Sequence, residues 1–193
     1  GLVAVTLVFP LMLILMGVGM FVGLGAGSLI SIRLGQKDKA GAELILGNAL
    51  SLVIILVLLT TAVSLWFLDP LLLFLGATPE VMPYARDFSL IILGGSIFMH
   101  VSFGLNNLIR AQGDPHTALK TMLIAALLNA ALNPLFIFGF DMGIKGSAWA
   151  TVAAQIVATV WVLVYFIKGS GTMQLKAQNL RLQRKIFSEI ARI

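Results

Sequence analysis

Long apolar runs alternate with short polar segments along this chain, and the alternation predicts its helices. Five runs contain no Asp, Glu, Lys or Arg, and they occupy residues 2–32, 44–68, 88–109, 121–140 and 146–167. Each run reaches the roughly 20 residues that a helix needs to cross a bilayer. The pattern therefore predicts an all-α membrane protein, a polytopic helix bundle with five transmembrane helices within residues 1–168. Residues 169–193 are basic and amphipathic, and we expect them to lie on the cytoplasmic membrane surface.

Composition and charge support this prediction and exclude other classes. The chain is 59% hydrophobic and 11% charged, with a mean hydropathy of +1.02, which is too apolar for a soluble domain of this size. It has no cysteine, which excludes disulfides and thiolate metal sites. The net charge of +5 follows the loops, so we interpret it as membrane topology and expect no nucleic-acid partner.

Basic residues are distributed unevenly between the two sets of loops. Of the 13 Lys and Arg residues, only Arg86 and Lys145 fall on one side of the predicted bundle. Cytoplasmic loops carry the excess of Lys and Arg. This distribution places the last residues in the cytoplasm and the first residues outside, in a multi-pass protein of a prokaryotic inner or plasma membrane.

Polar side chains interrupt the fourth run at two positions. Asn129 and Asn133 are four residues apart, so a helix places both carboxamides on one face. Pro134 has no N–H, so it is expected to kink the helix and to free the carbonyl of Ala130. Polar groups within a membrane span are by default candidates for an ion or substrate site. The alternative is that both asparagines only bond to a neighbouring helix.

A second polar stripe follows on the fifth run. Ser147, Thr151 and Gln155 recur at steps of four, which is one face of a helix. A short connection makes this helix an antiparallel neighbour of the one that carries Asn129. We therefore expect the two stripes to face each other, with Asn129, Asn133, Thr151 and Gln155 as candidate cation- or substrate-binding residues.

His100 is the only titratable side chain predicted deep within a span. Near the middle of residues 88–109, it is a candidate proton relay or cavity-lining residue, and the alternative is a neutral histidine bonded between helices. Asn106 and Asn107 follow near the end of the same run, where water can reach them, and they are further candidates for cavity lining.

Enzymatic chemistry is not predicted. The chain has no cysteine, no HExxH motif and no pair of carboxylates within a span. Ser96 and His100 share a helix face as the best available dyad, but serine at helix contacts is ordinary packing. A non-transporting membrane subunit is a further alternative, which would explain the helices but not the repeated polar stripes.

Several ordered motifs resemble one known family. They are RLGQKDKAGAE at residues 33–43, LLLFLGATPEV at 71–81, YARDF at 84–88, LIRAQGDP at 108–115, NAALNPLFIFGF at 129–140 and GIKGSAWATVAAQ at 143–155. Together they resemble the multidrug and toxic compound extrusion (MATE) transporters over nearly the whole chain. The resemblance implies helices two to six of a six-helix lobe, so the first helix and the second lobe are expected to lie outside this sequence.

The resemblance also implies a function. It implies a secondary active transporter that exports organic, often cationic, drugs in exchange for Na⁺ or H⁺, without a cofactor, and whose partners are its substrates, membrane lipids and the remainder of the transporter. Asn129 and Asn133 fall at the family's cation- and substrate-linked site, and Thr151 faces them on the next helix. Many relatives have aspartate where this chain has Asn133.

The missing carboxylate bears on the coupling ion. Oxygens of Asn129, Asn133 and Thr151 suit Na⁺, whereas a proton requires His100 or a segment outside the chain, so the residues favour Na⁺. A lipid-linked precursor flippase of the same superfamily is the alternative within transport. It would be expected to have a more basic central cavity than these residues provide.

Overall fold

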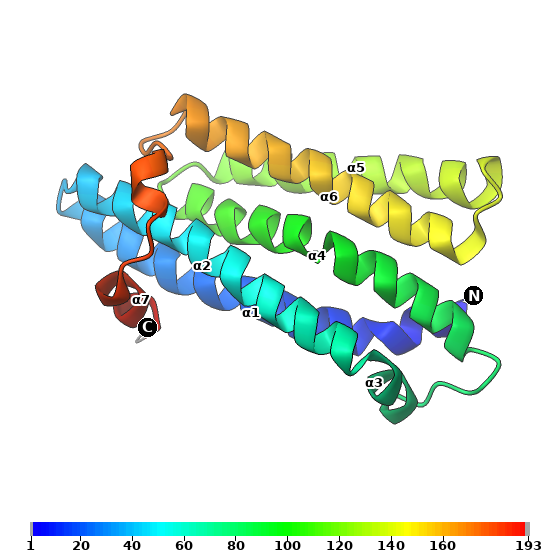
Figure 1. Ribbon diagram of the computed structural model, residues 1–193. Helices are drawn as coiled ribbons and strands as arrows, with labels where there is room; N and C mark the ends of the chain where they lie inside the picture. Colours follow the sequence, from blue (N-terminus) through cyan, green and yellow to red (C-terminus); the bar gives the residue numbers. More distant parts are fainter. Residues whose placement is uncertain (1, 192–193) are drawn as a thin grey trace.

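The computed structural model describes residues 2–191, which form one elongated bundle of roughly aligned helices (Figure 1). Five helices are long and apolar enough to cross a membrane: α1 (Leu2–Gly35), α2 (Lys39–Trp66), α4 (Met82–Ala111), α5 (Pro115–Pro134) and α6 (Gly143–Lys168). The short elements are α3 (Leu68–Phe74), the π-helical turn η1 (Leu135–Gly139), the 3-10 turn η2 (Ala177–Leu180) and α7 (Arg184–Ala191). The five predicted spans are confirmed in number and order.

Among the described residues, α2, α4, α5 and α6 begin earlier than their apolar runs, and polar caps start α2 and α5 outside the apolar segment. Asp38 precedes α2, and its carboxylate accepts a hydrogen bond from the backbone N–H of Gly41 at 2.8 Å. Asp114 precedes α5 and accepts from the N–H of Thr117 at 3.0 Å. Such caps satisfy N–H groups that have no partner within the helix. Charged residues at 39–43 and 110–120 therefore continue the helices beyond their predicted bounds.

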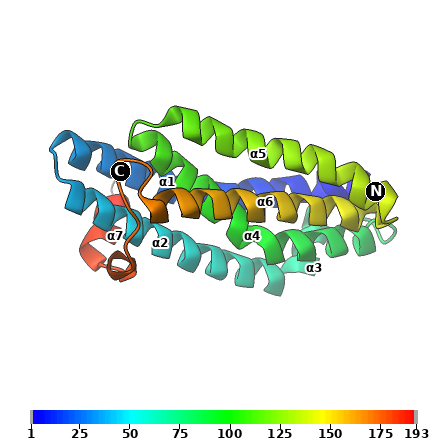
Figure 2. The same cartoon turned by 90° about the horizontal axis from the view of Figure 1, so that it is seen from above.

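Helix α4 occupies the middle of the bundle and contacts α1, α2, α5 and α6. Figure 2 shows α5 along one edge and α2 along the opposite edge, with α4 and α6 between them. Glycines allow α1 to approach α4 closely: a Cβ added to Gly23 would lie 2.8 Å from the Nδ2 of Asn107. On α5, by contrast, the apolar side chains of Leu119, Leu123 and Leu127 are at least half exposed.

The tail segment, residues 169–191, folds back over one end of the bundle, where α7 lies beside α1 and α2 (Figure 1). We call this end, which also carries residues 33–39 and the turn between α4 and α5, the basic end. The prediction that the tail's apolar face lies on the membrane is wrong for Ile186 and Ile190, which are buried in the protein core. The tail is amphipathic as predicted, but helices α1 and α2 supply the apolar surface that its inner face needs.

Polar side chains of α2 hold the tail segment in place. Asn48 donates from Nδ2 to the carbonyl of Asn179 at 3.2 Å, and its Oδ1 accepts from the N–H of Gln183 at 2.6 Å. One turn earlier, the buried carboxylate of Glu43 accepts from the N–H of Gln174 and pairs with the ammonium of Lys176. These contacts satisfy backbone groups of an irregular segment that would otherwise need water.

Candidate functional site

The two predicted polar stripes meet between α5 and α6. Asn133 donates from Nδ2 to the Oδ1 of Asn129 at 2.8 Å and to the Asn129 carbonyl at 2.9 Å. Asn129 in turn donates from Nδ2 to the Oγ1 of Thr151 at 3.0 Å, and Thr151 donates to the Ser147 carbonyl at 3.0 Å. The predicted contact between the stripes is confirmed, and the binding role of these residues stays a prediction.

Close packing at the start of α6 sets this register. A Cβ on Gly146 would lie 2.6 Å from the carbonyl oxygen of Phe136, so only glycine allows α6 to approach η1 this closely. After Pro134 the chain continues as the π-helical turn η1 instead of the α-helix. Proline removes a helical hydrogen bond, and the wider π-helical turn follows directly after this break. Whether the Ala130 carbonyl serves another partner stays a prediction.

A cavity of about 340 Å³ lies beside the Asn129–Thr151 contact, between α4, α5 and α6. Its volume falls within the range of about 300–1,000 Å³ that is usual for small-molecule sites. The described residues that line it include no Asp, Glu, Lys, Arg or His; they are Ser102, Phe103, Asn106, Thr121, Met122, Ala125, Ala126, Asn129, Thr151 and Gln155. The cavity is thus apolar, with uncharged polar groups at its wall.

The polar groups of the wall differ in whether they have partners. The hydroxyls of Thr121 and Thr151 donate to carbonyls of their own helices. Asn106 is only 3% exposed, yet among the described residues its Oδ1 has no hydrogen-bond partner, and the buried Oε1 of Gln155 has none either. Asn133 lies behind Asn129 and is not part of the cavity lining.

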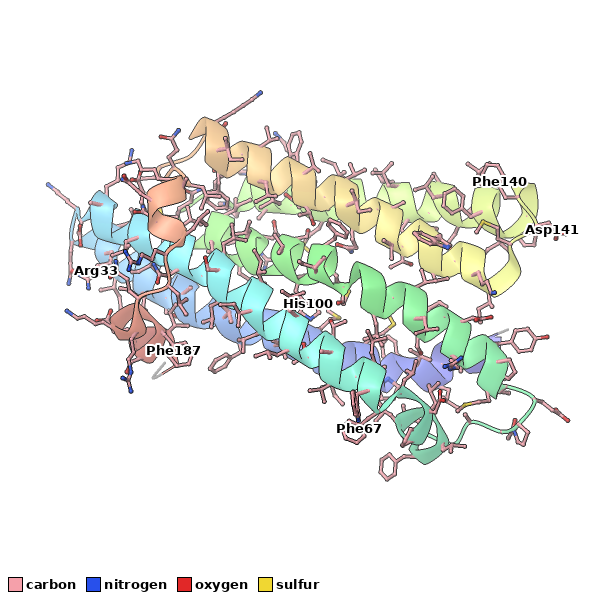
Figure 3. All side chains as sticks on the ribbon, viewed as in Figure 1. Arg33, Phe67, His100, Phe140, Asp141 and Phe187 are labelled. Carbon is pink, nitrogen blue, oxygen red and sulfur yellow. The ribbon has the colours of Figure 1, made fainter. Side chains whose placement is uncertain are left out.

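His100 and Asn107 lie apart from this cavity. His100 is 1% exposed, at the middle of the bundle (Figure 3), and its ring packs beside Gly19 of α1. Asn107 lines a separate recess of about 350 Å³ between α1 and α4. The structure therefore brings Asn106, Asn129, Thr151 and Gln155 together at one cavity and places His100 and Asn107 toward α1.

The Ser96 and His100 side chains do not form a catalytic dyad. The Nδ1 of His100 lies 2.6 Å from the backbone carbonyl oxygen of Ser96, while the Ser96 hydroxyl contacts the Oγ1 of Thr61 at 2.8 Å. A nucleophile must be within hydrogen-bond reach of its base. His100 therefore bonds to the backbone of Ser96, and the Ser96 hydroxyl contacts Thr61 of α2 instead of His100.

Asn129, Asn133 and Thr151 form a polar cluster whose uncharged oxygens are of a type that binds Na⁺. In the present structure, however, these oxygens are not oriented to bind a cation. The Oδ1 of Asn129 and the Oγ1 of Thr151 are hard oxygen donors of the type that such cations prefer. Both oxygens already accept amide N–H groups at 2.8 and 3.0 Å. A cation at this cluster would require the amides of Asn129 and Asn133 to turn, so that oxygens replace N–H groups.

The sequence analysis named Asn106 and Asn129 but missed the other residues of α4 and α5 that line the cavity. Ser102 and Asn106 are four residues apart, which was a usable signal of a third polar stripe. Phe103, Met122, Ala125 and Ala126 gave no signal, because apolar side chains in a membrane helix look alike whether they face lipid or a cavity.

A multi-pass helical membrane protein with a small-molecule-sized cavity is the class that this fold and site define. Residues 1–135 match the family model MatE, so the chain belongs to that family. The chain is 31% identical over 190 residues to the multidrug export protein MepA of Staphylococcus aureus strain NCTC 8325. A MepA of Staphylococcus saprophyticus is 26% identical over the same length. These matches cover 98% of the chain but 42% of each relative, so the chain spans less than half the length of these relatives.

Solved structures agree with this assignment. The inward-facing conformation of a multidrug resistance MATE family transporter of the MOP superfamily matches 98% of the chain at 27% identity, with a TM-score of 0.92. The outward-facing conformation of such a transporter matches 100% of the chain at 28% identity, with a TM-score of 0.93. The chain covers 43% of each of these structures. The predicted MATE resemblance is confirmed by both kinds of comparison.

Proposed function

We propose that this chain forms part of a secondary active transporter that exports organic, often cationic, compounds across the cell membrane. The observation that carries the proposal is the cavity between α4, α5 and α6, whose wall holds the Asn129–Thr151 contact. Membership of the MatE family and the multidrug export relatives support a transport role for this cavity. The complete transporter then contains further helices that close the substrate pathway.

We further propose Na⁺ as the coupling ion, with H⁺ as the second candidate. Asn129, Asn133 and Thr151 offer uncharged oxygens and no group that titrates near neutral pH, which supports Na⁺ over a proton at this cluster. We propose that the cluster has two arrangements. In the first, the amides of Asn129 and Asn133 bond to each other. In the second, their oxygens turn toward a cation. Proton coupling would instead use His100, which lies outside the cavity lining.

Alternating access in this proposal moves the bundle as one body. The chain superposes on an inward-facing and an outward-facing MATE structure with TM-scores of 0.92 and 0.93. Such equal agreement supports rotation of one packed unit against another, because a packed core resists continuous deformation. The cavity would then open to either side of the membrane without repacking α4, α5 and α6.

Efflux of a fluorescent organic cation from cells tests the site. Asn129→Ala in the complete transporter removes the donor to Thr151 and the acceptor of Asn133, so we expect efflux to fall by about tenfold, as for loss of one buried hydrogen-bonding group. Thr60→Val is the matched control, because the Thr60 hydroxyl bonds only to carbonyls of its own helix. Unchanged efflux by Asn129→Ala at equal expression would contradict the assignment.

A further inference from the structure

A second cavity, of about 240 Å³, lies at the basic end, between the end of α1, the start of α2 and the tail segment. None of the described residues lines both this cavity and the one between α4, α5 and α6. Its wall carries charges of both signs: Arg33 and Lys185 are basic, and Asp38 and Glu189 are acidic. The other described residues of the wall are uncharged, so the two positive and two negative charges balance.

The four charged groups differ in how far they are engaged. The Nη1 of Arg33 lies 3.3 Å from the Oδ2 of Asp38, whose Oδ1 already accepts the N–H of Gly41. The Nη2 of Arg33 lies 3.8 Å from the Oε2 of Glu189, which is too long for a hydrogen bond. Lys185 takes part in no ion pair among the described residues. The groups with spare capacity are therefore the ammonium of Lys185 and the carboxylate of Glu189.

Lys185 and Glu189 belong to one face of α7. They are four residues apart, and both line the cavity. Opposite charges at this spacing commonly pair with each other, yet these two form no ion pair within the described part of the chain. A simple anion here would meet the carboxylates, and a simple cation would meet Arg33 and Lys185. A zwitterion satisfies both free groups at once.

The cavity lies at the level of lipid headgroups. Arg33 is in the last turn of α1 and Asp38 precedes the first turn of α2, so both mark the end of a membrane span. Leu182 and Phe187 are each next in sequence to a lining residue, and they are 41% and 42% exposed. Figure 3 shows Phe187 at the same end of the bundle as Arg33. Exposed apolar side chains near a charged cavity suit an amphiphilic ligand.

We propose that this cavity binds the headgroup of a zwitterionic phospholipid with a primary amine, which is a phosphoethanolamine headgroup. Lys185 donates to a phosphate oxygen, and Glu189 accepts from the ammonium group at the end of the headgroup. The acyl chains lie along the exposed side chains of Leu182 and Phe187. A primary amine fits better than a quaternary one, because the described lining has a carboxylate acceptor and no aromatic ring.

Phospholipids that share one acyl length test the headgroup. They are phosphatidylethanolamine, its N-methyl and N,N-dimethyl forms, and phosphatidylcholine, which have three, two, one and no N–H donors at equal net charge. Native mass spectrometry of the purified complete transporter measures their binding. We expect phosphatidylethanolamine to bind about fivefold more tightly than phosphatidylcholine, because a half-exposed charge pair is worth about 1 kcal/mol.

Two variants separate the two ends of the headgroup. In Glu189→Gln the acceptor of the ammonium group is lost, so the preference for phosphatidylethanolamine should disappear. In Lys185→Gln the partner of the phosphate is lost, so all four lipids should weaken about fivefold while the preference remains. Lys168→Gln is the matched control, because Lys168 is an exposed basic residue at the end of α6 and lies outside the cavity lining. Without lipid, the Tm of each variant should equal that of the wild type.

Glycerophosphoethanolamine distinguishes a lipid from a soluble phosphodiester, because it carries the same headgroup without acyl chains. We expect it to bind more weakly than the lipid. Phe187→Ser should weaken binding of the lipid and leave binding of the soluble compound unchanged. Equal affinity for the two compounds would overturn the assignment to a lipid.

Three further outcomes would overturn the proposal. The first is equal binding of phosphatidylethanolamine and phosphatidylcholine to the wild type, and the second is a preference that persists unchanged in Glu189→Gln. The third is equal weakening by Lys168→Gln and Lys185→Gln, which would show attraction of lipids to basic residues in general. These measurements require no transport, so their outcome is independent of the proposed function.

Discussion

Asp114 joins three elements at the turn between α4 and α5. Its Oδ1 accepts the N–H of Thr117 at the start of α5, and its Oδ2 accepts the hydroxyl of Tyr165 from α6 at 2.9 Å. The same tyrosine accepts from the amide of Gln112 at 2.6 Å, and Gln112 accepts the N–H of Met173 in the tail segment. Asp114 thereby links α5 to α6, and Gln112 links the same tyrosine to the tail segment.

This geometry predicts an acid-dependent stability. The Thr117 N–H is the main cause that holds the pKa of the Asp114 carboxyl below its ordinary value of 3.8. Because the folded state favours the carboxylate, its stabilisation is present above pH 3.8 and is lost as pH falls through the lowered folded pKa. Asp114→Ala should lower the unfolding free energy by about 1 kcal/mol at neutral pH, or about 3 °C in Tm.

Thermal unfolding in detergent as a function of pH measures this effect. The wild-type protein should lose part of its Tm as acid is added, and Asp114→Ala should lose less. Asp141→Asn, at the opposite end of the bundle, is the control, because asparagine tolerates the left-handed backbone of Asp141 at φ 52°. Identical acid profiles for Asp114→Ala and wild type would contradict the role of the cap.

Residue spacing predicted part of the site and could not predict the rest. Asn129 and Thr151 were predictable because steps of four place polar groups on one helix face, and a short connection makes the two helices neighbours. The separation of Asn106 from Asn107 was not predictable, because adjacent residues point to different sides and only the packing of α4 decides which side faces the cavity.

At the scale of elements, α2 and the tail segment depend on each other. A Cβ on Gly47 would overlap the backbone of Asn179, so glycine allows the tail to cross α2 closely. The flanking anchors Glu43 and Asn48 supply hydrogen bonds to the same segment. The sequence predicted the amphipathic tail from its pattern, but a pattern cannot show whether an apolar face meets lipid or protein.

Gly47→Ala should release the tail segment. We expect faster protease cleavage and faster amide hydrogen exchange within residues 172–190, because the added methyl group displaces the backbone of Asn179. Gly94→Ala on α4 is the matched control: nothing lies within 4 Å of its added Cβ. This control should leave the tail protected and raise helix stability by up to about 1 kcal/mol. Equal protection of the tail in both variants would contradict the close crossing.

At the scale of the whole molecule, the proposed orientation places the basic end in the cytoplasm. This chain has no cysteine, so single cysteines at exposed Lys37 and Glu80 report each end separately once any cysteine in the rest of the complete transporter is replaced by serine. In intact cells that express the complete transporter, a membrane-impermeant maleimide should label Glu80→Cys and not Lys37→Cys. The positive-inside rule is the physical reason. Labelling of Lys37→Cys and not Glu80→Cys would show that the proposed orientation is wrong. The description of the fold would not be affected.

We propose that the cavity beside Asn129 and Thr151 serves a cation-driven exporter. Proteoliposomes that contain the complete transporter test it directly, with a fluorescent organic cation as substrate and imposed Na⁺ or H⁺ gradients. We expect the substrate to move against its own gradient when Na⁺ flows the opposite way, and we expect Asn129→Ala to lose this movement. Substrate movement driven by the H⁺ gradient alone would show that the coupling ion is H⁺ and not Na⁺. The coupling site would then lie outside Asn129, Asn133 and Thr151. Substrate movement that depends on neither gradient, or that persists in full in Asn129→Ala, would contradict this role of the cavity.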